Sequence, residues 1–158
     1  MRKSLKKGFG FGLTSGIITT LGLLIGLYAS TESKMVIIGG VIIIAIADAF
    51  SDAFGIHISE EACKVGNRHD GVWEATFATF SSKFFFALTF IIPLILFELF
   101  TAVIVSIVWG MFLLGLMSFV IAKEHKVKPW KVIGEHLLIA STVIALTYYV
   151  GKSINLIF

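Results

Sequence analysis

The sequence predicts an all-α membrane protein with five transmembrane helices. Of its 158 residues, 57% are hydrophobic and only 15% are charged, and the mean hydropathy is +0.95. A soluble domain usually carries about 25% charged residues, and a chain of this size lacks the interior volume to hide so much apolar surface from water. Lipid is therefore the expected solvent for most of these side chains. Five apolar runs reach the length of about 20 residues that crosses a bilayer.

These runs are expected to form one domain over residues 1–158. The first run is too long for the apolar core of a cleavable signal peptide, and no convincing cleavage site precedes the second run. The connections after the first and third helices are very short, so each joins two antiparallel neighbours. The expected helices cover about residues 8–30, 35–59, 76–97, 101–122 and 132–154.

The basic residues predict the orientation of the helices. Of the 13 Lys and Arg residues, only Lys34 and Lys152 fall on the side opposite the N-terminus. Connections rich in Lys and Arg stay in the cytoplasm, so we expect a cytoplasmic N-terminus and an outward-facing C-terminus. The same clustering explains the net charge of +3 without a nucleic-acid partner. The single cysteine, Cys63, excludes a disulfide framework and a Cys-based zinc or iron–sulfur site within one chain.

Two carboxylates inside the second span form the main candidate site. Asp48 and Asp52 lie four residues apart and therefore share one helical face. An ionisable residue within a span costs about 3 kcal/mol or more and indicates function by default. The two carboxylates repel each other unless a proton, a metal cation or a basic side chain from another helix lies between them. Lys83 is the only basic residue well inside another span. The alternative is a hydrated position near the interface.

Three further metal-ligand types follow on the same helix. His57, Glu60 and Glu61 continue it toward the cytoplasm. Imidazole and carboxylate groups suit divalent first-row metals. Their spacing is not a metal motif by itself, and a solvated helix end explains them equally well.

A row of small residues marks the first helix. Gly8, Gly12 and Gly16 recur every four residues, and such a row lets two helix backbones approach closely in lipid. The close approach is expected either within one protomer or at a dimer interface.

Two segments resemble the signatures of the vacuolar iron transporter family. They are SGIITTLGLLIGLYA at residues 15–29 and ADAFSDAFGIHIS at residues 47–59. The end of the chain also follows the family pattern of a fourth helix, a short basic loop with Pro-Trp and a fifth helix ending in Tyr-x-x-Gly. The resemblance implies a homodimer of five-helix protomers that exchanges Fe²⁺ or Mn²⁺ for protons along a path between the first two helices of both subunits. Positions matching the signatures are Gly16, Thr19, Thr20, Asp48, Ser51, Gly55 and Ser59.

The chain departs from the family at several of these positions. Ser15 stands where the family has an aspartate, and Asp52 where it has a methionine. Ile56 and His57 replace a Glu-Tyr pair, and the family's long cytoplasmic insert with its glutamate cluster is missing. Thioether ligands favour soft ions, whereas carboxylates favour hard ions such as Mn²⁺, Mg²⁺ or Ca²⁺.

The leading hypothesis is therefore a homodimeric transporter that exchanges a divalent cation, Fe²⁺ or Mn²⁺, for protons. The metal is its substrate, no permanent cofactor is expected, and the compact design suits a prokaryotic plasma membrane. A non-transporting membrane partner or assembly subunit with the same fold is the alternative. An intramembrane aspartyl protease is disfavoured, because both carboxylates lie on one helix, and no other enzyme class is indicated. The expected metal-site residues are Asp48, Asp52, Ser51, Ser15, His57, Glu60 and Glu61.

Overall fold

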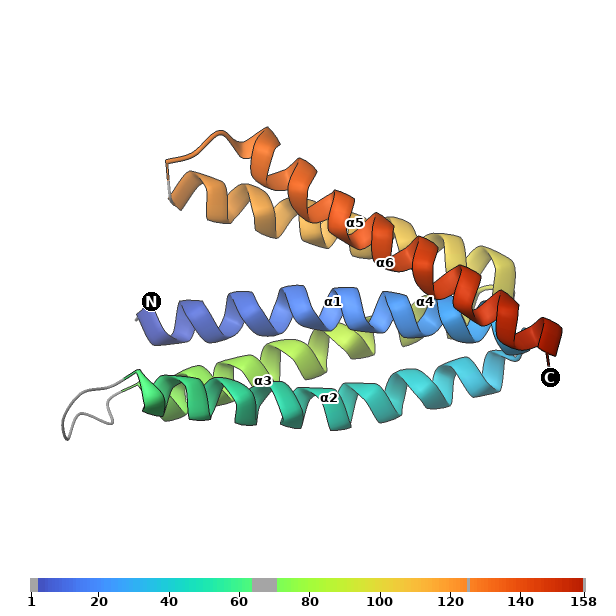
Figure 1. Cartoon of the computed structure of the whole chain (residues 1–158), viewed down its shortest axis with the longest axis horizontal. Coiled ribbons are helices and arrows are strands. Elements are labelled where there is room, and N and C mark those ends of the chain that lie inside the picture. The colour runs from blue at the N-terminus through green and yellow to red at the C-terminus, as the bar shows by residue number, and fades with distance from the viewer. Residues whose placement is uncertain (1–2, 64–70, 125, 158) are drawn as a thin grey trace.

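The computed structural model describes residues 3–63, 71–124 and 126–157, and its regular structure is entirely helical (Figure 1). Five segments are long and apolar enough to cross a membrane, with α3 and α4 together forming one of them. The predicted all-α architecture with five such segments is confirmed. The helices are α1 (Lys3–Thr31), α2 (Lys34–Ala62), α3 (Val72–Thr89), α4 (Ile91–Leu96), α5 (Leu99–Glu124) and α6 (Pro129–Ile157).

The helix ends differ from the predicted ones in a regular way. Most extend two to five residues beyond the apolar runs, because polar residues at the ends continue the same backbone hydrogen bonds. Pro129 begins α6, a position where its missing N–H is not needed.

The third span is not the single uninterrupted helix expected over residues 76–97. It divides at Phe90, between α3 and α4. Pro93 has no N–H to donate to the carbonyl group of Thr89, four residues earlier, and this accounts for the break.

Helix α1 is the centre of the molecule. It lies between the α2–α3 pair and the α5–α6 pair, and it contacts all four of these helices (Figure 1). Ile17, Leu21 and Leu24 of α1 are almost fully buried and share one hydrophobic core with Phe90 and Leu114. Toward the N-terminal end, α5 and α6 diverge from α1 (Figure 1).

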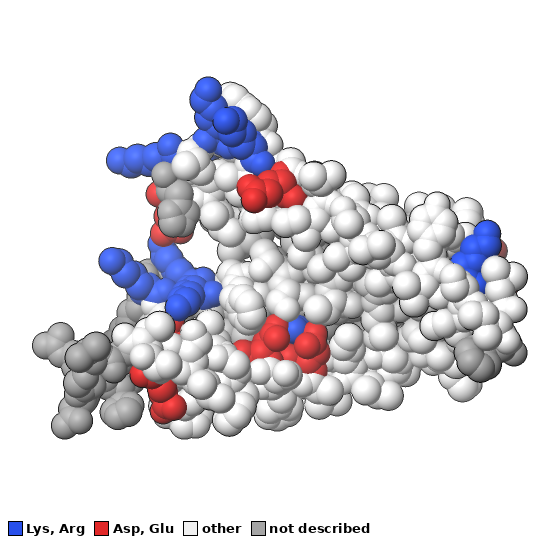
Figure 2. Space-filling view, in the orientation of Figure 1, with Lys and Arg blue, Asp and Glu red and all other residues white. Residues whose placement is uncertain are grey.

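Charge is concentrated at the two ends of the bundle. Figure 2 shows most Lys and Arg side chains at the end that holds the N-terminus, and a smaller basic patch at the opposite end. The N- and C-termini lie at opposite ends, in keeping with five crossings (Figure 1). Lys83 is the exception to this distribution, because it lies within α3 and is only 1% exposed.

Candidate functional site

The glycine row of α1 brings α1 and α3 into close contact. A Cβ atom added at Gly12 would lie 2.2 Å from Ser82 Oγ, and one at Gly8 would lie 2.2 Å from the carbonyl oxygen of Ala75. At Gly16 the added atom would lie 3.1 Å from Cγ of Lys83. Of the two uses considered for this row, the structure shows packing within the protomer.

Close packing of α1, α2 and α3 surrounds the ammonium group of Lys83 with acceptors. Its Nζ atom lies 2.6 Å from Asp48 Oδ2 and forms a second ion pair with Asp52 Oδ2. Nζ also donates a hydrogen bond of 2.9 Å to Ser15 Oγ, and the Ser15 hydroxyl donates one of 2.6 Å to Asp52 Oδ2. We call these four residues, Ser15, Asp48, Asp52 and Lys83, the lysine–aspartate cluster.

The lysine–aspartate cluster identifies the positive charge that the two carboxylates require. Of the three sources considered from sequence, a proton, a metal cation or a basic side chain, the structure contains the basic side chain. With both carboxylates ionised and the lysine protonated, the cluster carries one net negative charge. Its position inside three candidate spans makes that charge costly in hydrocarbon.

The two carboxylates are held unequally. Asp52 accepts hydrogen bonds from both Ser15 and Lys83. The contact between Asp48 and Lys83 is short enough for an ion pair, but its angles do not make a hydrogen bond, and Asp48 Oδ2 lacks a hydrogen-bond partner among the described residues. Asp48 is therefore the carboxylate better placed to accept a proton or another cation.

The cluster also has a definite front and back. The side chain of Lys83 is 1% exposed, whereas those of Asp48 and Asp52 are 26% and 21% exposed. Figure 2 shows this arrangement as acidic atoms around a basic one, halfway along an otherwise uncharged surface. The carboxylates therefore face outward, with the ammonium group behind them.

A groove between α1 and α2 leads to this front. Its volume is about 860 Å³, and its walls are mostly apolar. Asp48 and Ser51 are its polar residues on α2, and Thr19 lies on the α1 side. The hydroxyl of Thr19 donates to the carbonyl oxygen of Ser15, so it is already engaged within its own helix. Ser51 is exposed and extends the polar surface beside Asp48.

The remaining expected ligands lie elsewhere. His57 pairs through Nδ1 with Thr76 Oγ1 at 2.9 Å, and its Nε2 lies 3.4 Å from Glu61. Glu60 forms an ion pair with Lys7 of α1. Glu60 follows Asp52 by eight residues, about 12 Å along a helix. His57, Glu60 and Glu61 therefore belong to the basic end of the bundle and not to the cluster.

The structure thus brings together part of the predicted site. Ser15, Asp48 and Asp52 meet, and Ser51 lines the adjoining groove. Within the described ranges, no group of three or more His, Cys, Asp or Glu side chains is placed to hold a metal ion. Lys83 is the member that the predicted site omitted. Its signal was a lysine within a phenylalanine-rich span, opposite the glycine row.

No family model, curated protein or solved structure matches this chain. The argument for a function therefore depends on the chemistry of the lysine–aspartate cluster and of the groove in front of it.

Proposed function

We propose that this protein is a homodimeric transporter that exchanges a divalent metal cation, Fe²⁺ or Mn²⁺, for protons. The observation that supports it most is the lysine–aspartate cluster, three ionisable groups inside candidate membrane spans. Such groups are rare within membranes and typically line ion pathways or proton relays. The resemblance of residues 15–29 and 47–59 to vacuolar iron transporters supports the choice of substrate.

Charge balance supports the coupling. One cluster carries a formal charge of minus one, so two clusters facing each other across a dimer axis carry minus two. One divalent cation neutralises that charge, and so do about two protons. Exchange of one for the other leaves the site neutral in both loaded states, which is the arrangement that hydrocarbon surroundings favour.

Lys83 acts in this mechanism as a tethered cation. It occupies the carboxylates when the substrate is absent, and the arriving metal ion competes with its ammonium group for the same oxygens. Asp48 engages the metal first, because its Oδ2 lacks a hydrogen-bond partner among the described residues, and Asp52 follows once Lys83 and Ser15 release it. Carboxylate and hydroxyl oxygens favour a hard ion, so Mn²⁺ is the better fit of the two.

The exposed face of α2 supports the dimer. Partly exposed carboxylates cannot face lipid tails cheaply, so protein or water must cover Asp48 and Asp52. The groove beside them is flanked by Ile43, which is 68% exposed, and Phe50, which is 62% exposed. A second copy seated on this face would cover the groove and place the two clusters opposite each other.

A second candidate function has its own supporting observation. Lys83 satisfies the carboxylates within one chain, and a buried ion-paired cluster of this kind also occurs as a structural element. The chain would then be a non-transporting membrane partner that retains the fold. Metal flux separates the two candidates.

The test is transport into proteoliposomes under an imposed pH gradient. We expect Mn²⁺ or Fe²⁺ uptake that requires the gradient and is lost in Asp52→Asn. Glu135→Gln, an exposed carboxylate change on α6, is the matched control and should retain full flux. Flux that persists in a folded Asp52→Asn protein would contradict the site, and no flux for any ion would favour the partner role.

The dimer has a separate test. In a Cys63→Ser background, Ser51→Cys places the only thiol beside Asp48 on the proposed interface. We expect this variant to form a disulfide-linked dimer in membranes, whereas Leu138→Cys, on the exposed face of α6, should not. Equal cross-linking of both variants would contradict an interface formed by α2.

A further inference from the structure

A second hollow lies at the basic end of the molecule, between α1 and the diverging α5–α6 pair (Figures 1 and 2). Its volume is about 970 Å³. We call it the basic cleft, and the residues that define it include Lys3, Lys6, Lys7, Phe9, Leu114 and Met117. It does not include the lysine–aspartate cluster.

The interior of the basic cleft is apolar and has the length of an acyl chain in one leaflet. Phe9 and Ile18 of α1 face Leu114 and Ile121 of α5 across it. The nine residues from Phe9 to Ile18 span about 14 Å along a helix. The hydrocarbon core of a bilayer is about 30 Å thick, so one leaflet contributes about 15 Å. The cleft therefore reaches from the membrane surface to near the midplane.

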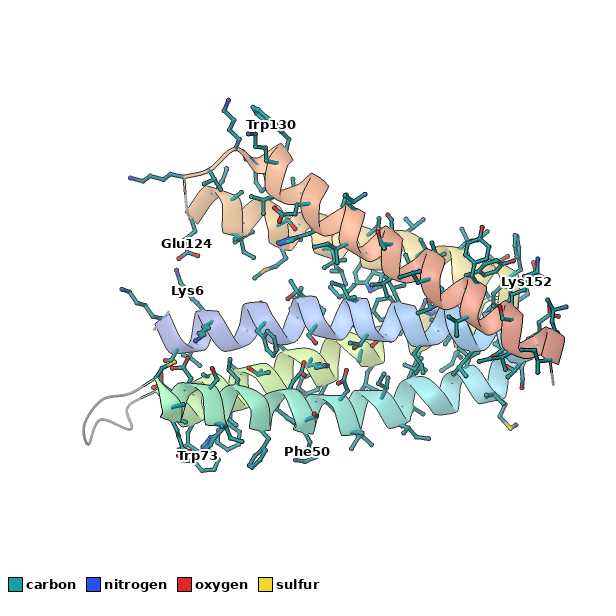
Figure 3. The ribbon with its side chains drawn as sticks, in the orientation of Figure 1. Lys6, Phe50, Trp73, Glu124, Trp130 and Lys152 are labelled. Carbon is teal, nitrogen blue, oxygen red and sulfur yellow. The ribbon has the colours of Figure 1, made fainter. Side chains whose placement is uncertain are left out.

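The mouth of the basic cleft is cationic. Lys3, Lys6 and Lys7 are exposed and come from the first turns of α1. Lys6 forms an ion pair across the mouth with Glu124 of α5, and Figure 3 shows the two side chains pointing toward each other. Lys7 pairs with Glu60 on α2. Counting the lining residues, three lysines face one glutamate, and His136 lies deeper on α6.

We propose that the basic cleft binds an anionic phospholipid from the leaflet at this end of the protein. The acyl chain lies between α1 and α5, and the headgroup phosphate binds the lysines at the mouth. Hydrocarbon must fill an apolar hollow that opens into lipid, and the lysines favour a headgroup with a net negative charge. This inference concerns a different part of the molecule from the proposed transport site and does not depend on it.

Glu124 gives the proposal a distinctive sign. The phosphate competes with the Glu124 carboxylate for Lys6, so removing that carboxylate should strengthen lipid binding. A purely structural contact between α1 and α5 would behave in the opposite way, because Glu124→Gln and Lys6→Gln would then weaken the protein equally. The two substitutions therefore distinguish a lipid site from a helix-to-helix contact.

The experiment is native mass spectrometry of the purified full-length protein titrated with phosphatidylglycerol or phosphatidylcholine in detergent. We expect one preferred phosphatidylglycerol per chain and weaker binding of phosphatidylcholine. Lys3→Gln with Lys6→Gln should lower phosphatidylglycerol affinity about tenfold, since each lysine near an anionic lipid contributes roughly a factor of five and Glu124 offsets part of it. Lys128→Gln with Lys131→Gln removes equal charge from exposed positions outside the basic cleft and is the matched control. Glu124→Gln should raise the affinity.

One more variant tests the acyl-chain part of the site. A Cβ atom added at Gly10 would already lie 3.2 Å from Cε of Met117, so Gly10→Leu fills the basic cleft without changing charge. It should reduce binding of both lipids.

Three outcomes would overturn the proposal. The first is equal affinity for the two lipids. The second is an equal loss in the two double-lysine variants, which would indicate only a diffuse basic surface. The third is displacement of the lipid by soluble glycerol phosphate at matching concentration, which would indicate a phosphate site without a lipid chain.

Discussion

The two halves of this molecule pack differently around the same central helix. In the half formed with α2 and α3, α1 places its glycines directly against the α3 backbone and encloses Lys83. In the other half, α5 and α6 diverge from α1 and leave the basic cleft. Half of the most apolar stretch of α1 is buried within the chain, against 11% for α6. The difference shows where sequence changes should matter and where lipid substitutes for protein.

Glycines make the contrast specific. Gly8 and Gly12 each face α3 atoms that an added Cβ would approach to 2.2 Å, whereas Gly115 on α5 and Gly134 on α6 have nothing within 4 Å of that position. The same residue type therefore maintains a close helix contact in one half and faces open space in the other. That close contact sets the distance at which Lys83 reaches both aspartates.

The largest effect is expected from Lys83→Met. Removing the ammonium group leaves two carboxylates unpaired inside the spans, and removing one partner of a buried ion pair costs about 3–5 kcal/mol. We expect most of the loss to be recovered when Asp48→Asn and Asp52→Asn are added, because the repulsion is then gone. Unfolding in mixed micelles measures both steps. A stable Lys83→Met protein would contradict the burial of the cluster.

The next largest effect is expected from Gly12→Leu. The new side chain meets Ser82 and the carbonyl oxygen of Thr79, so α1 must move away from α3. Overpacking of this kind costs about 3 kcal/mol. Gly134→Leu, in open space on α6, is the control and should leave the unfolding midpoint unchanged. Equal behaviour of the two variants would show that the halves do not differ in packing.

A smaller effect is expected from Ser15→Ala. It removes the hydroxyl that donates to Asp52 and accepts from Lys83, and a hydrogen bond to a charged group contributes about 2 kcal/mol. Ser153→Ala removes an exposed hydroxyl on α6 that donates to the Tyr149 carbonyl, and it should change stability by less than about 0.5 kcal/mol. The free energy of unfolding of the two variants gives the comparison, and an equal small change in both would remove Ser15 from the cluster.

The smallest effect on stability is expected from Lys6→Gln. The ion pair of Lys6 with Glu124 is exposed at the mouth of the basic cleft, and exposed pairs contribute about 1 kcal/mol or less. Unfolding at low and high salt should show the difference from wild type disappearing as salt screens the pair. A loss as large as that of Lys83→Met would mean that this contact holds the α5–α6 half in place.

The sequence predicted the parts of the site that depend on one helix at a time. Apolar runs located five spans, and four-residue spacing placed Asp48 and Asp52 on one face. It left open which charge lies between them, because that depends on how closely α1 and α3 approach, a property of the glycine contacts between helices. Lys83 was visible only as a charge with no assigned partner.

Two other features escaped for related reasons. The break at Phe90 follows from Pro93, whose local effect a count of apolar residues does not register. His57, Glu60 and Glu61 shared a helix with the aspartates and so looked like one ligand series. Helical distance places them at the basic end, where Thr76 and Lys7 engage two of them. The orientation across the membrane and the homodimer stay predictions.

The measurement that tests the transport proposal most directly is proton release on metal binding. Mn²⁺ is added to the purified protein in weakly buffered detergent solution, and the pH change is recorded with an indicator dye alongside the bound metal. Charge balance at paired lysine–aspartate clusters predicts about two protons released per Mn²⁺, with both binding and release lost in Asp52→Asn. Mn²⁺ binding without proton release, or binding unchanged in Asp52→Asn, would contradict the account.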